Sequence, residues 1–230
     1  ELLYWDYGFG ILLTTLLLAF TLGSNGTEGR SFLSDMKQAE SANLLSAFAG
    51  GVVFNLANIL LVAAIGIAGM SVAFPVGIGI ALVLGVVVNY ISTPQGNPVL
   101  IFGGVALITL AIVLNARAYQ KLQTNAEGGI SKKGLILSVV SGCLMGLFYK
   151  YVAGSMVTNF NVPDAGKLTP YTALVLFAIG IVISSFVFNT LQMMRPFSGT
   201  SVTFSTYFKG LTRDHLIGAF GGVIWCVGMS

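Results

Sequence analysis

Charged side chains are scarce in this sequence. Its 230 residues include 11 Lys or Arg, 8 Asp or Glu and a single His, so charged residues make up only 8% of the chain. Soluble domains average about 25% charged residues, and this chain has too few to cover a water-exposed surface. The scarcity excludes a soluble enzyme, a nucleic-acid-binding protein and a disordered chain.

Signatures of catalysis and of metal or nucleotide binding are also missing. The two cysteines, Cys143 and Cys226, lie in apolar stretches, which predicts buried thiols and no disulfide framework. No metal-ligand spacing and no nucleophile motif occur. The phosphate-binding pattern G-x-x-x-x-G-K-[ST] is absent, since Gly166-Lys167 is followed by Leu168. We therefore predict that the protein is not an enzyme and that it uses no cofactor, metal or nucleic acid.

Long apolar runs dominate what is present. Hydrophobic residues make up 55% of the chain, and the mean hydropathy is +0.88. A helix that crosses a bilayer needs about 20 mostly apolar residues, and seven runs approach or exceed that length. They fall near 2–22, 43–66, 70–91, 98–118, 134–153, 170–192 and 216–230. We predict an all-α polytopic membrane protein surrounded by the lipid bilayer.

Two sequence matches at nearly one spacing suggest an internal repeat. The run Gly-Ile-Leu-Leu-Thr-Thr from Gly10 aligns with Gly-Ile-Val-Ile-Ser-Ser from Gly180, and Gly-Gly-Val-Val-Phe from Gly50 aligns with Gly-Gly-Val-Ile-Trp from Gly221. The alternative is chance, because Gly, Val and Ile are common here. Five runs separate the starts of the two copies, so the second copy is expected to be inverted. Inverted repeats are typical of secondary transporters.

The repeat predicts how the chain is divided. Residues 1–119 would be a first repeat lacking its first helix, residues 120–133 a central cytoplasmic loop, and residues 134–230 a second repeat lacking its last two helices. Because the first and last runs begin and end while still apolar, we expect an internal fragment holding about seven of ten helices.

The distribution of basic residues predicts the orientation. The loops 116–134 and 193–215 hold seven Lys or Arg, whereas the loops 23–42 and 150–169 hold four. Basic residues are more frequent in cytoplasmic loops. This places 116–134 and 193–215 on the cytoplasmic side.

Four segments carry a resemblance to a known family. They are Tyr4-Trp5-Asp6-Tyr7, Phe54-Asn55-Leu56-Ala57-Asn58, Ala73-Phe74-Pro75-Val76-Gly77-Ile78-Gly79 and Gly221-Gly222-Val223-Ile224-Trp225-Cys226. Together they resemble the ureide permease family and its bacterial relatives, within the drug/metabolite transporter superfamily. The resemblance implies a ten-helix transporter, of the 5+5 type, for small polar solutes such as ureides, nucleobases or sugars. The short loop 116–134 fits the bacterial branch and hence the bacterial inner membrane.

The best candidates for solute contact lie inside the second run. Asn55 and Asn58 are three residues apart and share one helix face. Each amide offers donors and an acceptor to a polar solute. Phe54 lies beside them, and Trp225 is its equivalent in the repeat, so two aromatic faces could hold a flat heterocycle or a sugar ring. The alternatives are that the amides join neighbouring helices and that the rings pack against lipid.

Other polar and small residues in the runs have structural interpretations. Hydroxyls in membrane helices usually bond back to their own carbonyls, and this is expected of Thr14, Thr15, Ser184 and Ser185. The pair Gly142 and Gly146 has the spacing typical of close helix packing.

Asp6 is the one acidic residue set within an apolar run rather than at its very end. A carboxylate inside the membrane could carry a coupling proton, and the coupling ion could also be sodium. The competing interpretation places Asp6 at headgroup level, with Tyr4, Trp5 and Tyr7 as an interfacial aromatic belt. His215 is expected to be a solvated loop residue.

These patterns favour a secondary transporter that works by alternating access. The alternative functions are a membrane channel and a membrane subunit that does not transport. The sequence does not indicate the substrate, the coupling ion or the oligomeric state.

Overall fold

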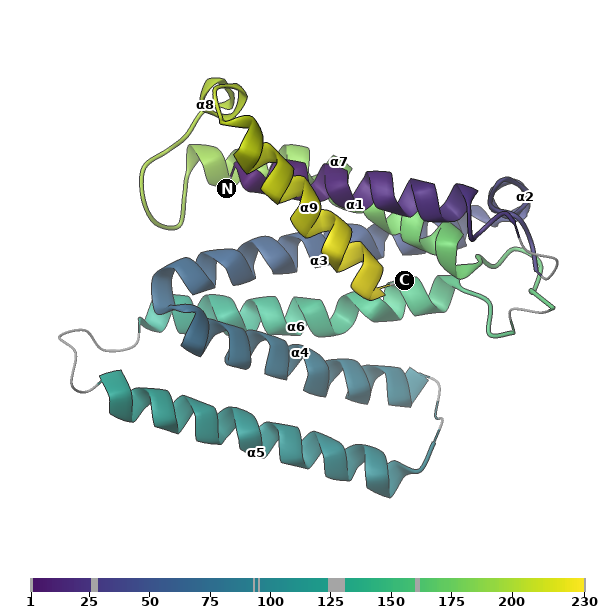
Figure 1. Ribbon diagram of the computed structural model, residues 1–230. Helices are drawn as coiled ribbons and strands as arrows, with labels where there is room; N and C mark the ends of the chain where they lie inside the picture. Colours follow the sequence, from purple (N-terminus) through teal and green to yellow (C-terminus); the bar gives the residue numbers. More distant parts are fainter. Residues whose placement is uncertain are drawn as a thin grey trace. The chain divides into compact units, whose positions relative to one another are not determined.

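The computed structural model describes residues 2–25, 29–92, 94, 96–123, 131–159 and 162–229, and these residues are helical almost throughout (Figure 1). Within them the β structure is limited to one isolated bridge between Met156 and Leu168. The helices are α1 (Leu3–Phe20), α2 (Phe32–Gln38), α3 (Ser41–Ala68), α4 (Met70–Ser92), α5 (Pro98–Gln123), α6 (Lys132–Ser155), α7 (Pro170–Met194), α8 (Phe204–Phe208) and α9 (Thr212–Met229). The expected all-α class is confirmed.

In the part of the chain that the structure describes, six helices are long and apolar enough to cross a membrane: α1, α3, α4, the first 18 residues of α5, α6 and α7. In lipid, a helix satisfies its backbone hydrogen-bonding groups internally, which explains why these apolar runs are helical. The seventh expected run corresponds to α9, which is not among the six. Its first turn carries Arg213, Asp214 and His215, and these polar residues lower the hydropathy of the 18-residue helix.

Two short helices were not expected from the sequence. α2 and α8 lie in the loops 23–42 and 193–215, where the composition is mixed and no long apolar run occurs. α8 begins after Thr203, whose side chain accepts a hydrogen bond from the backbone N–H of Thr206. Such a cap satisfies one of the free N–H groups at a helix start. Of the expected central loop 120–133, residues 124–130 lie outside the described residues, while its two ends belong to α5 and α6.

The chain forms two compact units. One contains residues 1–55 and 151–230, and the other contains residues 56–150. In the first unit α1 packs against α7 and α9, and Figure 1 shows α9 (yellow) crossing α1 (purple). In the second unit α4 packs against α5.

Glycines form the closest helix contacts of the first unit. A Cβ on Gly222 of α9 would overlap the carbonyl oxygen of Tyr7 in α1, and one on Gly10 would overlap that of Ala219. Likewise, a Cβ on Gly51 of α3 would overlap the carbonyl oxygen of Phe177 in α7, and one on Gly180 would overlap that of Phe48. Each helix pair therefore requires glycine for its backbones to approach so closely.

In the second unit, glycines again allow helices to approach each other. A Cβ on Gly142 or Gly146 of α6 would crowd backbone and side-chain atoms of α4; one on Gly146, for example, would lie 3.0 Å from Ala81 O. This confirms that the pair serves helix packing. Between α3 and α4, Gly69 adopts φ of 81°, a conformation that ends a helix and that glycine adopts without strain.

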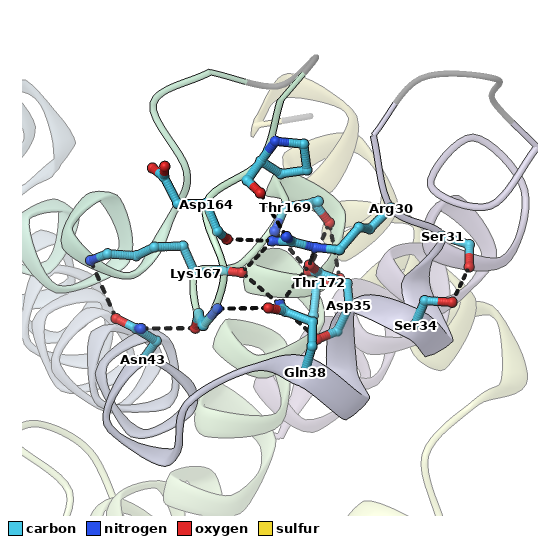
Figure 2. Close-up of polar contacts among 12 residues, drawn as sticks. Arg30, Ser31, Ser34, Asp35, Gln38, Asn43, Asp164, Lys167, Thr169 and Thr172 are labelled. Carbon is cyan, nitrogen blue, oxygen red and sulfur yellow. Dashed lines mark hydrogen bonds and ion pairs between the residues drawn. The ribbon is translucent and has the colours of Figure 1, made fainter.

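A polar clasp joins two loops of the first unit at the start of α7 (Figure 2). We use this name for Arg30, Asp35, Gln38, Lys167 and Thr169. The fully buried carboxylate of Asp35 pairs with Arg30 Nε at 2.8 Å and accepts hydrogen bonds from Thr169 N at 2.7 Å and Thr169 Oγ1 at 3.0 Å. The guanidinium of Arg30 and the amide of Gln38 both donate to Lys167 O. Because Thr169 precedes α7, the clasp joins Arg30 and the helix α2 to the start of α7.

Asp35→Asn is expected to destabilise the protein measurably. The amide keeps the size of the side chain but removes the charge that pairs with Arg30. Hydrogen bonds to charged groups contribute about 1.5–3 kcal/mol each, so the unfolding temperature of the purified intact protein should fall. Lys37→Gln is the matched control, because Lys37 lies exposed in the same α2 helix. If Asp35→Asn has the same unfolding temperature as the wild type, the clasp does not stabilise the fold.

Candidate functional site

Asn55 joins three helices in the first unit. Its side chain on α3 is fully buried. Its Oδ1 accepts a hydrogen bond from Tyr4 Oη of α1 at 2.8 Å, and its Nδ2 faces Ser184 Oγ at 2.7 Å and Ser185 Oγ at 3.2 Å on α7. A buried amide is costly unless its donors and acceptor are paired, and here both ends have partners. These contacts agree with the alternative interpretation, in which the amide joins neighbouring helices.

Three aromatic rings of the first unit form a cluster that includes Phe54, the neighbour of Asn55 in the sequence. The centroid of the Trp225 ring is 4.8 Å from that of Phe54 and 5.8 Å from that of Phe177, and Phe177 and Trp225 are stacked with an interplanar angle of 10°. Phe54 and Phe177 are buried, whereas Trp225 is half-buried. The structure thus brings together the predicted residues Phe54, Asn55 and Trp225 and adds Phe177, which sequence reasoning missed.

Asn58, the remaining predicted contact residue, is half-buried in the part of α3 that belongs to the second unit. Its spacing from Asn55 places both residues on one face of α3. The predicted back-bonding of hydroxyls is confirmed on α1, where Thr14 Oγ1 donates to Gly10 O and Thr15 Oγ1 donates to Leu12 O. On α7, Ser184 and Ser185 donate to Ile181 O in the same way.

Asp6 has two polar partners. Tyr207 Oη of α8 donates to Asp6 Oδ1 at 2.7 Å, and His215 Nδ1 of α9 lies 2.9 Å from Asp6 Oδ2. An ionised carboxylate only accepts hydrogen bonds, so Nδ1 of His215 then carries the hydrogen. The Tyr207 ring stands edge-on to the imidazole, with centroids 4.7 Å apart. The three side chains form one hydrogen-bonded group that links α1, α8 and α9.

This arrangement corrects one expectation. His215 is not a solvated loop residue, because it lies in α9 and pairs with a buried carboxylate. Two of the aromatic residues around Asp6 contact other helices. Trp5 is buried and its Nε1–H donates to Met193 Sδ at 3.3 Å, while Tyr4 binds Asn55. Trp5 thus contacts α7, against which α1 packs, and Tyr4 contacts α3.

The environment of Tyr207 keeps its hydroxyl protonated. Burial, the hydrogen bond to Asp6 and the negative charge of that carboxylate, in this order of size, raise the pKa of Tyr207 from 10.0 to about 12. At neutral pH the hydroxyl is therefore a donor, and it holds one oxygen of Asp6 in place.

Two further amides on α7 lack the partners that Asn55 has. Among the side chains that the structure describes, Asn189 Nδ2 and Gln192 Oε1 are buried and have no hydrogen-bond partner. Asn189 is 1% exposed and Gln192 8%. Leaving a buried polar group unpaired costs roughly 1–3 kcal/mol, so two such groups on one helix require an explanation.

The residues that sequence reasoning missed gave weak signals. Phe177 occupies the position equivalent to Tyr7 in the repeat spacing that relates Gly10 to Gly180. Tyr207 and His215 lie more than 200 residues from Asp6, and no local pattern links them.

In the parts of the chain that the structure covers, no group of three or more His, Cys, Asp or Glu could hold a metal ion.

Membrane-spanning helices with buried polar and aromatic side chains between them define an integral membrane protein of the polytopic α-helical class. The chain belongs to the ureide permease family, because the family model described as "Ureide permease" matches residues 3–133.

Individual relatives support the same assignment. The chain is 29% identical to "Ureide permease 2" of Arabidopsis thaliana over 133 residues, which cover 56% of this chain and 33% of the relative. It is 25% identical to "Ureide permease 3" of the same plant over 224 residues, covering 85% of this chain and 64% of the relative. It is also 27% identical to the "L-rhamnose-proton symporter" of Shigella dysenteriae serotype 1 (strain Sd197) over 201 residues, which cover 80% of this chain and 58% of the relative.

The matched part of this chain thus spans less than two thirds of each of these relatives. No solved structure matches the chain.

Proposed function

We propose that the protein is a secondary transporter that moves a small polar organic solute across the membrane by alternating access. The solute would be a ureide, a nucleobase or a sugar, as the names of the relatives suggest. The observation that carries the proposal is the buried amide of Asn55 between the membrane-spanning helices α1, α3 and α7, together with the ring cluster of Phe54, Phe177 and Trp225 in the same unit. Polar groups inside a bundle of membrane helices are expensive and usually serve a pathway or a binding site.

The proposed contact residues are Phe54, Asn55, Asn58 and Trp225. The faces of Phe54 and Trp225 would stack on a planar or ring-shaped solute. Asn55 already has partners on α1 and α7, so its first role would be to join these helices to α3. It would contact the solute only where these hydrogen bonds rearrange during the transport cycle.

The proposal includes an inverted repeat, divided as 1–119, 120–133 and 134–230. The glycine contacts of the first unit support it. The contact of Gly222 with Tyr7 corresponds, through the repeat spacings of 171 and 170 residues, to the contact of Gly51 with Phe177. The contacts of Gly10 with Ala219 and of Gly180 with Phe48 correspond in the same way. Such paired contacts are expected of two copies related by a two-fold axis.

We further propose that a proton couples to transport through Asp6, with sodium as the alternative ion. The hydrogen-bonded group of Asp6, Tyr207 and His215 supports a proton-accepting role, and one relative is named a proton symporter.

The proposed location is the inner membrane of a bacterium. It is supported by the short loop 116–134 and by the lack of a phosphate-binding motif.

The orientation is testable by labelling single cysteines in the intact protein. Cysteine introduced at Lys132 should react with a membrane-impermeant reagent only from the cytoplasmic side, and cysteine at Lys37 only from the outside. The reason is the excess of basic residues in the loops 116–134 and 193–215. The opposite labelling pattern would contradict the proposed orientation.

Uptake by cells that express the intact protein tests the proposed function. A panel of labelled ureides, nucleobases and sugars should include at least one solute whose uptake saturates with concentration and is competed by the unlabelled solute. Linear, non-saturating flux would favour a channel. An absence of flux for every solute would favour a subunit that does not transport.

A further inference from the structure

One face of α7 carries a row of buried polar side chains. Ser185, Asn189 and Gln192 are separated by four and three residues, a spacing that aligns side chains along one face of a helix. All three are buried. An apolar environment would ordinarily select apolar residues at such positions, so the row is a feature of the sequence that requires a reason.

The two ends of this row differ. At Ser185 the polar groups are satisfied, because the hydroxyl faces Asn55 Nδ2 and donates to Ile181 O. One and two turns further along, Asn189 Nδ2 and Gln192 Oε1 have no partner among the described residues. The nearby Trp5 does not supply one, since its Nε1–H donates to Met193 Sδ.

The two unpaired atoms are complementary in kind. Asn189 Nδ2 is a hydrogen-bond donor, and Gln192 Oε1 is an acceptor. Residues three apart on a helix are separated by about 4.5 Å along the axis, which a small solute can span. A ligand that places an acceptor beside a donor would therefore satisfy both atoms at once.

We infer that Asn189 and Gln192 together bind the edge of a solute that carries a C=O beside an N–H, as a ureide or a pyrimidine base does. The carbonyl oxygen accepts from Asn189 Nδ2, and the N–H donates to Gln192 Oε1. This edge is planar and presents both atoms side by side, so both bonds form without ordering a rotatable hydroxyl, as a sugar would require. The inference rests on the proposed function and adds two residues that determine its selectivity.

A structural role for these amides makes the opposite prediction about stability. If Asn189 and Gln192 hold the fold together, apolar replacements of the same size should lower the unfolding temperature. If they serve a ligand, removal of unpaired buried polar groups should leave the unfolding temperature unchanged or raise it. The variants Asn189→Leu and Gln192→Met separate these two roles.

The experiment uses the purified intact protein and three probes. Uracil carries C=O beside N–H, 1,3-dimethyluracil keeps the carbonyls but has no N–H, and L-rhamnose carries hydroxyls instead of an amide edge. We expect wild type to bind uracil and to bind dimethyluracil more weakly. Each of the two variants should bind uracil roughly five- to tenfold more weakly, the loss of one hydrogen bond, with no fall in unfolding temperature. Thr190→Val is the matched control, since Thr190 is half-buried on another face of the same helix.

Four outcomes would overturn the inference. If both variants bind uracil as tightly as the wild type, the amides do not contact the solute. If they bind uracil more weakly and also unfold at a lower temperature, the amides have a structural role. Binding of L-rhamnose but not of uracil would exclude the amide edge while leaving the proposed transport function intact. If wild type binds none of the three probes and transports no solute of the uptake panel, the proposed function fails together with this inference.

Discussion

Asp6→Asn is expected to abolish accumulation of solute against its gradient while leaving exchange of solute across the membrane intact. The carboxylate lies in α1, a membrane-spanning helix, where ionisable residues are rare and often relay protons. An amide can still accept the hydrogen bond from Tyr207, which Asp6 Oδ1 accepts at 2.7 Å, but it cannot gain or lose a proton at neutral pH. The packing should thus survive, and only the coupling should be lost.

The expected size of this effect follows from the driving force. A gradient of one pH unit is worth about 1.4 kcal/mol per proton, so one proton per solute supports about tenfold accumulation. The variant should instead equilibrate the solute at equal concentrations inside and outside. The measurement is uptake into proteoliposomes with an imposed pH gradient. Asp214→Asn is the control, because Asp214 is an exposed carboxylate in the first turn of α9. Tenfold accumulation by Asp6→Asn would show that another group carries the proton.

Gly222→Ala is expected to prevent stable folding, whereas the same change at Gly228 of the same helix should not. A Cβ at Gly222 would overlap Tyr7 O and approach Ile11 N to 2.8 Å, so that only a shift of two helix backbones could relieve the overlap. Overpacking costs typically 1–3 kcal/mol and occasionally more, and backbone overlap belongs at the upper end. A Cβ at Gly228 meets nothing within 4 Å, and alanine is a better helix former than glycine by about 1 kcal/mol.

The proposed inverted repeat extends this prediction to a second site. In the proposal Gly51 is the equivalent of Gly222, and a Cβ on Gly51 would overlap Phe177 O, so Gly51→Ala should reduce the yield of folded protein to a similar degree. The measurement is the monodisperse fraction in detergent and its unfolding temperature. Equal stability of the Gly222 and Gly228 variants would contradict the close packing of α1 and α9. If Gly222→Ala lowers the unfolding temperature and the folded fraction but Gly51→Ala changes neither, the proposed symmetry is contradicted.

The sequence predicted the long helices well because lipid leaves a spanning segment few alternatives. An apolar run of sufficient length must pair its own backbone groups, so runs such as 70–91 and 170–192 could be placed close to the ends of α4 and α7. The short helices α2 and α8 could not be predicted in this way, because each depends on its contacts. α2, for example, carries Asp35, whose partners Arg30 and Thr169 lie in two different loops.

The candidate site was only partly predictable for the same reason. Helical spacing and the repeat singled out Phe54, Asn55 and Trp225, but whether an amide is paired depends on the opposite helix. Asn55 meets hydroxyls of α7, whereas Asn189 and Gln192 on α7 meet no partner for one atom each. Polar residues at the end of an apolar run are common near the membrane surface, so their burial could not be read from the sequence.

Counterflow in proteoliposomes tests the central claim most directly. Vesicles that contain the intact protein and a high concentration of unlabelled solute are diluted into a trace of the labelled solute, with uracil, a ureide and L-rhamnose each tried in turn. A carrier that alternates between two faces exchanges inside for outside solute, so the label should transiently accumulate above its external concentration for at least one of the three. A channel would only equilibrate the label, and a subunit that does not transport would admit none. Either of these two results, for all three solutes, would contradict the assignment as a secondary transporter.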